Sequence, residues 1–306
     1  MTILRWIGRV TLAVLALGAF AAAAVYGETE RRRHRRVPQP PRATLVVRHD
    51  SATLAHGRHL MQSSLACGGC HGDDLGGRVV VDEPMVMRLV APNLTTGRGG
   101  VLARYDDAAL DAAIRHGVDP DGRVLVIMPS HEFAGVADDD LAALIAWLRA
   151  QPPVDREPGR LALGPVARVL GLAGKLHLFP YDIIDHDAVP PARAPRGESV
   201  ERGRYIAAGC TGCHGRDLRG GPIAGAPPGW PPASDLTARG AVGRWSESEF
   251  LHTLRTGRRP DGSSLRAPMP WREVGRMTDE ELRSLRRYLQ SLDRDPSGAR
   301  SAGSTQ

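Results

Sequence analysis

The chain of 306 residues is long enough for two domains of roughly 100 to 150 residues, the usual size at which one hydrophobic core closes. Its net charge of +6 is unevenly distributed, with −6 over residues 43–155 and +5 over residues 201–306. No basic stripe accompanies a helix, finger or sheet signature of nucleic-acid recognition, so no nucleic-acid partner is expected. The opposite charges predict either different partners for the two halves or attraction between them.

The N-terminal segment combines Arg5 and Arg9 with a mostly apolar run, Val10–Tyr26. As a helix this run would span about 26 Å, at the short end of what crosses a bilayer. We expect residues 1–30 to be an export segment retained as a membrane anchor, with the protein on the periplasmic side of the bacterial inner membrane. Small residues at Ala21–Ala24 leave a cleaved signal and a soluble periplasmic protein as the alternative. Residues 31–49 are expected to form a basic, proline-rich linker.

A tandem duplication organises the rest of the chain. The segment Cys-Gly-Gly-Cys-His-Gly-Asp-Asp-Leu that begins at Cys67 returns from Cys210 as Cys-Thr-Gly-Cys-His-Gly-Arg-Asp-Leu. Further pairs follow in the same order: Asn93–Thr95 with Asp235–Thr237, Arg104–Tyr105 with Arg244–Trp245, Pro120–Gly122 with Pro260–Gly262, Met128–Pro129 with Met269–Pro270, and Asp138–Leu141 with Asp279–Leu282. We therefore assign domains to residues 50–151 and 200–293, a linker to residues 152–199 and a disordered polar tail to residues 294–306.

Both copies have the pattern of short helices joined by loops rich in glycine and proline. Apolar residues at helical spacing follow Asp138–Asp140 in the first copy and Glu281 in the second. Capping-box patterns begin at Ser246 and Thr278, and the counterpart of the Ser246 helix is expected near Asp106. Since no run of alternating β-branched residues predicts a sheet, we expect an all-α fold of two tandem domains.

The linker contains one moderately apolar stretch, Leu161–Phe179. We expect one helix there that packs across both domains. The alternative is a helix on a membrane surface, because Arg168 and Lys175 lie among apolar residues such as Val166 and Leu170.

All four cysteines, Cys67, Cys70, Cys210 and Cys213, belong to two Cys-x-x-Cys-His motifs. In this pattern two thiols reach the vinyl groups of one haem and the adjacent imidazole ligates its iron. A thioredoxin-like pair would accompany a βαβ pattern, a zinc site would bring its cysteine pairs closer, and structural disulfides would not require an adjacent histidine. We expect two covalently bound haem c groups with His71 and His214 as axial ligands, each imidazole hydrogen-bonded through its other nitrogen.

The sixth ligands are expected to be Met128 and Met269, which lie at matching places in the two copies and each precede a proline. His131 is a rival near Met128, but the second copy has no histidine at its equivalent position. Thioether ligation raises the reduction potential and occupies the site where oxygen or peroxide would bind, which favours electron transfer over catalysis.

Together these motifs resemble the small monohaem cytochrome c domain, over roughly residues 50–150 and 200–293. They are especially similar to the domains of the cytochrome c subunit of bacterial membrane-bound alcohol, aldehyde and gluconate dehydrogenases, which usually carries three haems. The resemblance implies an electron-transfer protein, not an enzyme, that passes single electrons from a dehydrogenase or quinol-oxidising complex to an oxidase or soluble cytochrome. A dihaem peroxidase with one open iron is the alternative.

Overall fold

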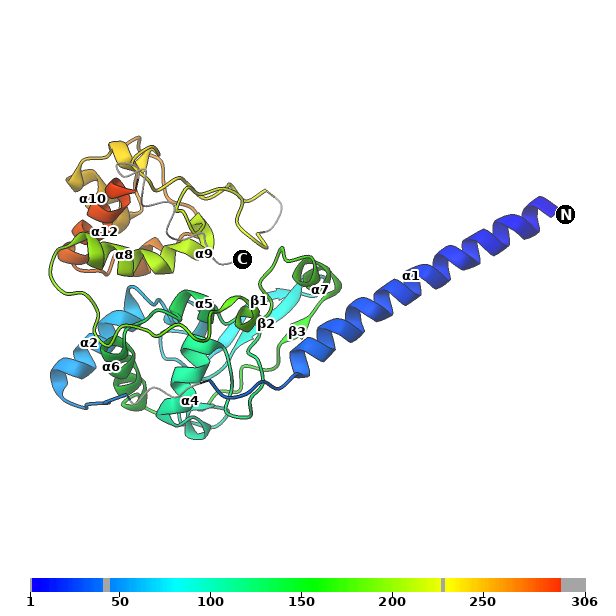
Figure 1. Ribbon diagram of the computed structural model, residues 1–306, viewed down its shortest axis with the longest axis horizontal. Helices are drawn as coiled ribbons and strands as arrows, with labels where there is room; N and C mark the ends of the chain where they lie inside the picture. Colours follow the sequence, from blue (N-terminus) through cyan, green and yellow to red (C-terminus); the bar gives the residue numbers. More distant parts are fainter. Residues whose placement is uncertain (1, 41–44, 227–228, 293–306) are drawn as a thin grey trace.

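A computed structural model describes residues 2–40, 45–226 and 229–292. One long helix, α1 (Thr2–His34), projects from two small helical domains (Figure 1). Within the described residues, α1 is the one helix long and apolar enough to cross a membrane. It continues through Arg31–His34, so the basic cluster expected in a linker belongs to the helix instead. The tail predicted over residues 294–306 lies outside the described residues.

The first domain contains five helical segments and a small sheet. Its helices are α2 (Ser51–Gln62), α3 (Gly68–His71), α4 (Asp107–Asp111), which continues as the π-helical turn η2 (Ala112–His116), α5 (Ser130–Phe133) and α6 (Asp138–Arg149), with a 3₁₀ turn η1 at Leu102–Arg104. The carboxylate of Asp106 caps α4, as its position in the repeat predicts. Three aspartates occupy the first turn of α6, where they complement the positive end of the helix dipole.

The second domain repeats this order, and its described residues form no sheet. Its helices are α8 (Val200–Ala207), α9 (Thr211–His214), α10 (Glu247–Thr256), α11 (Trp271–Val274) and α12 (Asp279–Ser291), with 3₁₀ turns η4 (Ala208–Cys210) and η5 (Val242–Arg244). Both predicted capping boxes are present, Ser246 with Glu249 on α10 and Thr278 with Glu281 on α12. The prediction of two mainly helical domains after an N-terminal apolar segment is confirmed.

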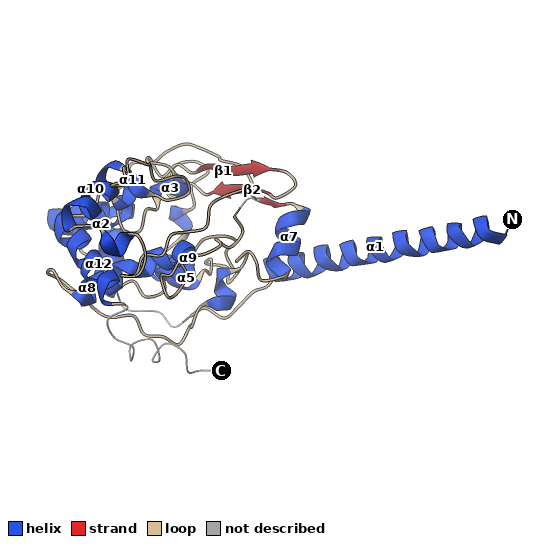
Figure 2. Ribbon diagram, turned by 90° about the horizontal axis from the view of Figure 1, so that it is seen from above, coloured by secondary structure: helices blue, strands red, loops and turns tan. Residues whose placement is uncertain are grey.

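The expectation that no sheet forms is wrong. Strands β1 (Arg78–Glu83) and β2 (Met87–Ala91) form an antiparallel hairpin, and β3 (Ala162–Leu163) from the linker adds to β2 (Figure 2). Three successive β-branched residues, Val79 to Val81, were the available signal. The strands are too short to show a clear alternation, and the third comes from a distant part of the chain.

The linker helix α7 (Pro165–Leu172) does not pack across both domains. It lies against the domain end of α1, and its Ala167 belongs to a small core with Met87 of β2 and Leu163 of β3. The linker then forms a 3₁₀ turn η3 (Pro180–Ile183). Only beyond α7 does the linker reach the second domain, where a Cβ added at Gly225 would lie 2.5 Å from Cδ1 of Leu176.

The first and last helices of each domain cross at a glycine. A Cβ at Gly57 of α2 would lie 2.0 Å from the carbonyl oxygen of Ala143 on α6, and one at Gly203 of α8 would lie 2.0 Å from that of Ser284 on α12. Only glycine permits this approach of two helix backbones, although it lowers intrinsic helix stability by about 1 kcal/mol relative to alanine. The crossing sets the position of everything between the two helices.

We predict that Gly203→Ala lowers the unfolding free energy of the second domain by about 1–3 kcal/mol, because the clash is with a backbone oxygen that has no rotamer to change. Gly57→Ala should act likewise on the first domain. Chemical denaturation of each variant measures the effect. The control is Gly135→Ala, where no atom lies within 4 Å of the added Cβ. Equal stability of Gly203→Ala and Gly135→Ala would contradict the crossing geometry.

Candidate functional site

Each Cys-x-x-Cys-His motif ends in a buried histidine whose Nδ1 is already engaged. His71 Nδ1 lies 3.0 Å from the carbonyl oxygen of Pro92, and His214 Nδ1 lies 2.8 Å from that of Ser234. Because a carbonyl only accepts, Nδ1 carries the proton and the lone pair of Nε2 is left for a metal. Burial lowers the pKa of both imidazoles and so favours the neutral form that can ligate iron.

The repeated Asn-Leu-Thr and Asp-Leu-Thr segments hold these two carbonyls in place. The side chain of Asn93 accepts a hydrogen bond from the amide of Thr95 (2.9 Å), and Asp235 accepts one from Thr237 (2.8 Å). Each turn follows directly on the residue whose carbonyl meets the histidine. The sequence shows these segments as part of the repeat but does not indicate this supporting role.

The expected thioether ligand shares a core with the attachment motif in both copies. Cys67 and Met128 pack against the first-domain core, and Cys210 and Met269 pack against the second-domain core. All four cysteines are free thiols in the structure. Burial raises the pKa of Cys67 and of Cys210 to about 12.

The rival ligand His131 is not among the residues that pack against the first-domain core, and its buried Nδ1 has no hydrogen-bond partner among the described residues. Its ring makes an edge contact with His177 of the linker, with 5.6 Å between centroids, and its Nε2 lies 3.9 Å from Oε1 of Glu132. Met128, in contrast, contacts the core that the attachment motif also contacts. This difference supports Met128 over His131.

The residues brought together fit a c-type haem. Each copy offers two unpaired thiols, one neutral imidazole with an oriented ring, and one thioether on the same core. Two thiols can hold the macrocycle by thioether bonds while nitrogen and sulfur donors suit iron.

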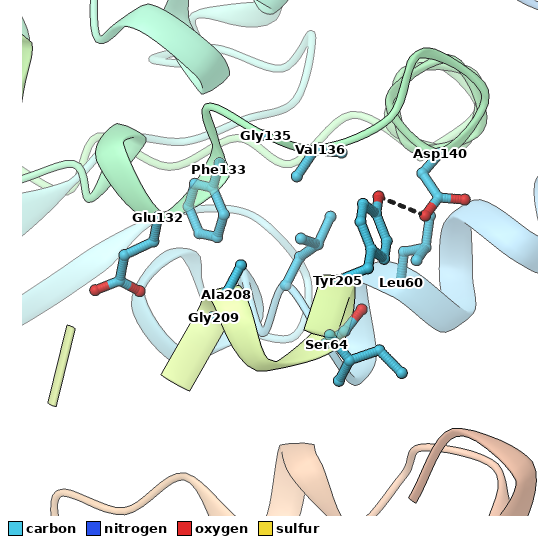
Figure 3. A pocket seen from close by; sticks show the side chains of 12 residues that line it. Leu60, Ser64, Glu132, Phe133, Gly135, Val136, Asp140, Tyr205, Ala208 and Gly209 are labelled. Atoms are coloured by element: carbon cyan, nitrogen blue, oxygen red, sulfur yellow. Dashed lines mark hydrogen bonds between the residues drawn. The ribbon is translucent and has the colours of Figure 1, made fainter. Parts of the chain in front are cut away.

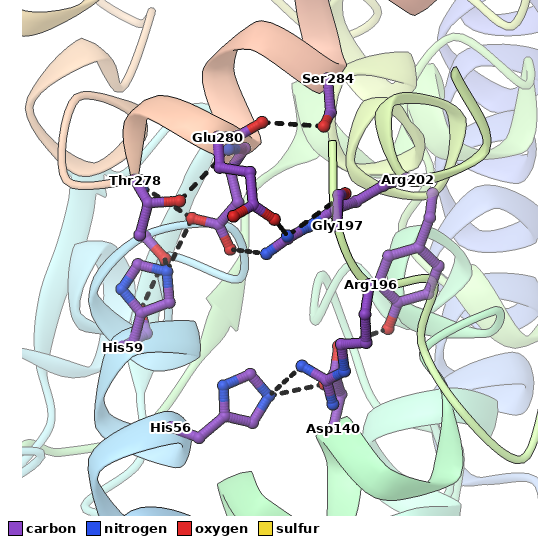
Figure 4. A network of polar contacts seen from close by, with 12 residues as sticks. His56, His59, Asp140, Arg196, Gly197, Arg202, Thr278, Glu280 and Ser284 are labelled. Atoms are coloured by element: carbon purple, nitrogen blue, oxygen red, sulfur yellow. Dashed lines mark hydrogen bonds and ion pairs between the residues drawn. The ribbon is translucent and has the colours of Figure 1, made fainter. Parts of the chain in front are cut away.

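The two domains meet through a pair of equivalent contacts. His59 lies two residues after the crossing Gly57, and its Nε2 is 2.8 Å from Oε2 of Glu281 on α12 (Figure 4). Tyr205 lies two residues after the crossing Gly203, and its hydroxyl donates to Oδ2 of Asp140 on α6 at 2.8 Å (Figure 3). His59 and Tyr205 are equivalent in the repeat, as are Asp140 and Glu281. The interface therefore has approximate two-fold symmetry.

Further polar groups surround the carboxylates of Asp140 and Glu281 and the acidic residues beside them. Oδ1 of Asp140 lies 2.7 Å from Nε2 of His56, and Arg196 of the linker donates to Asp139 at 2.7 Å. Arg202 contacts Glu280 and donates to Glu281 at 3.2 Å. The Tyr205 hydroxyl also accepts from the amide of Ala137 at 3.0 Å, so the buried phenol has both a donor and an acceptor partner. Each half of the interface is thus a satisfied polar network.

The charge state of the His59–Glu281 pair is set by its partners. The hydrogen bond to Glu281 raises the pKa of His59. Burial disfavours the charge on Glu281, yet hydrogen bonds from His59 and the Thr278 amide, with the charge of Arg202, outweigh it and lower the pKa of Glu281 to about 2. The pair is therefore an ion pair in mildly acidic solution.

Beside the Tyr205–Asp140 contact lies a cavity of about 40 Å³ lined mainly by apolar residues of both domains, with Glu132 at its far end (Figure 3). The Glu132 carboxyl reaches the second attachment motif, since a Cβ added at Gly212 would lie 1.7 Å from its Oε1. Burial raises the pKa of Glu132 to about 7. Because Glu132 follows Met128 by four residues, the methionine loop of the first domain lies against the haem-attachment motif of the second.

Comparison with known families identifies both copies. Residues 200–293 match the family described as cytochrome c, and residues 52–148 match the family described as cytochrome c oxidase, cbb3-type, subunit III. Neither match includes α1 or the linker.

Characterised relatives include subunits of several dehydrogenases. The chain is 28% identical to a nicotinate dehydrogenase subunit of Pseudomonas putida over 80% of its own length and 22% of the relative's. It is 27% identical to the cytochrome c subunit of the quinone alcohol dehydrogenase of Gluconacetobacter polyoxogenes, over 79% of its own length and 56% of the relative's. It is 28% identical to the cytochrome c subunit of gluconate 2-dehydrogenase of Pantoea cypripedii, over 84% of its own length and 62% of the relative's. The chain thus spans less than two thirds of the length of each of these relatives.

The interface should respond to pH through His59. Its raised pKa means that the ion pair stabilises the folded state fully below the ordinary value of 6.5 and loses this contribution as pH rises through the raised value. The lowered pKa of Glu281 makes its contribution complete above 4.5 and lost as pH falls toward about 2. We predict that His59→Gln lowers the unfolding midpoint most between about pH 4.5 and 6.5, and less at pH 9.

Thermal unfolding of the wild type and the variant across this pH range measures the effect. His252→Gln, a change at an exposed position on α10, is the matched control. A deficit of His59→Gln that stayed constant from pH 6 to pH 9 would show that the charge on His59 does not contribute.

Proposed function

We propose that the chain, whose two tandem domains match cytochrome c family models, carries one haem c in each domain and passes single electrons between them. The observation that carries this proposal is the repeated donor set. In each copy a Cys-x-x-Cys-His motif and a Met-Pro loop meet on one core. Haem c supplies the reversible one-electron couple when bound, and the chain attaches it, orients it and sets its potential.

The proposed ligands divide into two equivalent sets. Cys67 and Cys70 hold one haem, with His71 and Met128 as axial ligands. Cys210 and Cys213 hold the other, with His214 and Met269 as axial ligands. The Nδ1 hydrogen bonds to Pro92 and Ser234 support this assignment, because such bonds fix the ring orientation of a ligating histidine and increase its basicity.

Electron transfer between the domains is supported by their mutual orientation. The segment after Met128 abuts Gly212, which lies between Cys210 and Cys213. The proposed ligand loop of the first domain thus faces the proposed attachment site of the second. The paired contacts of His59 and Tyr205 hold this arrangement.

The donor and acceptor are proposed to be other redox proteins. Several relatives are cytochrome subunits of dehydrogenases, which favours a dehydrogenase as the donor and an oxidase or soluble cytochrome as the acceptor. The net charges of −6 and +5 on the two halves favour partners of opposite sign at each domain. Such fields act mainly on association rates and weaken with salt.

We also propose that α1 remains attached and anchors the protein on the periplasmic side of the inner membrane. Helix α1 runs without a break from its apolar segment into the residues that contact the linker helix α7. Its last turns are bound to the first domain through Thr29 and Glu30, which both contact Arg168.

The first test of the function is the haem content of the exported protein. After acid extraction, we predict an intact mass equal to the polypeptide plus two haems. Replacing Cys67 and Cys70 by alanine should remove one haem, and the matched replacement of Cys210 and Cys213 should remove the other. Loss of both haems from either variant, or an unmodified wild-type mass, would contradict two independent attachment sites.

The axial assignment predicts separate effects on two potentials. Met128→His should lower the potential of one haem and Met269→His that of the other, since imidazole stabilises oxidised iron more than a thioether does. Redox titration measures both, and Met85→Leu, at an exposed turn, is the control. The reduced wild-type spectrum should not change with carbon monoxide. A carbon monoxide complex in the wild type would instead indicate the open iron of a peroxidase.

A further inference from the structure

Helix α7 is oriented opposite to an ordinary surface helix. Its single charged residue, Arg168, is 6% exposed, whereas Val166 and Val169 on the outward face are 39% and 53% exposed. A helix at a water-exposed surface normally turns its charged residues outward and its apolar residues inward. The outward face of α7 is therefore suited to a non-aqueous environment.

Arg168 is buried because it binds the end of α1. Its guanidinium lies 4.3 Å from the ring centroid of Tyr26, donates to Oγ1 of Thr29 at 2.8 Å and pairs with Oε1 of Glu30 at 2.5 Å. Its Nε donates to the carbonyl of Leu163 at 3.1 Å. These contacts satisfy a buried charge and attach α7 to one place on α1.

That place is the expected boundary of the membrane. The apolar run of α1 ends at Tyr26, and tyrosine is enriched at the level of the lipid headgroups. Polar residues begin with Glu28, which is ion-paired with Arg31 at 2.7 Å. Because Arg168 contacts residues on both sides of this boundary, α7 lies at headgroup level.

The turn between β1 and β2 extends the apolar face of α7. Met85 is 64% exposed, and its carbonyl accepts a hydrogen bond from the amide of Val166 at 3.0 Å. The amide of Gly164 bonds the carbonyl of Val86 at 2.9 Å, so the turn and the start of α7 are joined. Both ribbon views place α7 and the hairpin on the side of the first domain from which α1 projects (Figures 1 and 2).

We propose that Met85, Val166 and Val169 form a lipid-contact patch that seats the first domain on the bilayer surface. The occupant is lipid because the patch adjoins the membrane boundary of α1. Lys175, exposed three residues beyond the end of α7, suits phosphate headgroups. The proposal rests on retention of α1, and it adds a second, peripheral contact that fixes how the domain is oriented above the membrane.

The test uses the full-length holoprotein in nanodiscs of phosphatidylethanolamine and phosphatidylglycerol. Single cysteines at Val166→Cys, Val169→Cys and Met85→Cys are spin-labelled, and the collision rates with oxygen and with a water-soluble nickel chelate are measured. Val14→Cys in the apolar part of α1 is the lipid reference, and Val189→Cys, at a linker position that is 91% exposed, is the aqueous reference. We expect oxygen-to-nickel ratios several-fold above that of Val189→Cys at all three patch positions.

Ratios equal to that of Val189→Cys would overturn the proposal by placing the patch in water. Low accessibility to both reagents would also overturn it, because another protein or a second copy would then cover the patch. Wild-type protein treated with the same spin label, and its intact mass, separate failure of this proposal from failure of the proposed function. If it takes up label, the native thiols are not attached to haem, and if its N-terminus is missing, α1 has been cleaved.

Discussion

The close crossing of the first and last helix in each domain is the constraint on which the two proposed haem sites depend. The first helix leads into the Cys-x-x-Cys-His motif, and the last helix follows the Met-Pro loop. The crossing at Gly57 in the first domain and the crossing at Gly203 in the second therefore fix the distance between the histidine side and the methionine side of each site. The remaining contacts, such as the Nδ1 bond to Pro92, adjust ring orientation within that frame.

The same helices also make the interface between the domains. The residues that touch across it, His59 and Tyr205, lie two positions beyond the crossing glycines, and they meet the first turns of α12 and α6. An interface in which equivalent residues make equivalent contacts is the geometry of a symmetric dimer. A duplicated chain keeps such an interface while allowing its two halves to diverge, as the exchange of histidine for tyrosine shows.

The helices, caps and repeat could be predicted because their signals are local. A capping box such as Thr278 with Glu281 occupies four residues, and an apolar stripe specifies one face of a helix. The hairpin with β3 could not be predicted this way, because pairing with Leu163 depends on the path of the linker. The glycine crossings had a detectable signal, since glycine inside a helix implies a packing reason. The prediction that the linker helix packs across both domains was wrong, because a pattern shows which face is apolar and not what covers it.

The proposed iron ligands are a different case, since their residue types follow from the motifs whereas their supporting groups do not. Nothing in the sequence marks Pro92 or Ser234 as acceptors, because a backbone carbonyl is available at every position. The two halves of the interface are likewise equivalent in geometry but not in chemistry. The His59–Glu281 ion pair is lost as pH rises through the raised pKa of His59, whereas the Tyr205 hydroxyl, whose pKa is raised by burial and by Asp140, keeps its proton. Alkaline conditions therefore weaken only the His59–Glu281 contact. The Tyr205–Asp140 contact continues to hold the methionine loop of the first domain against the attachment motif of the second.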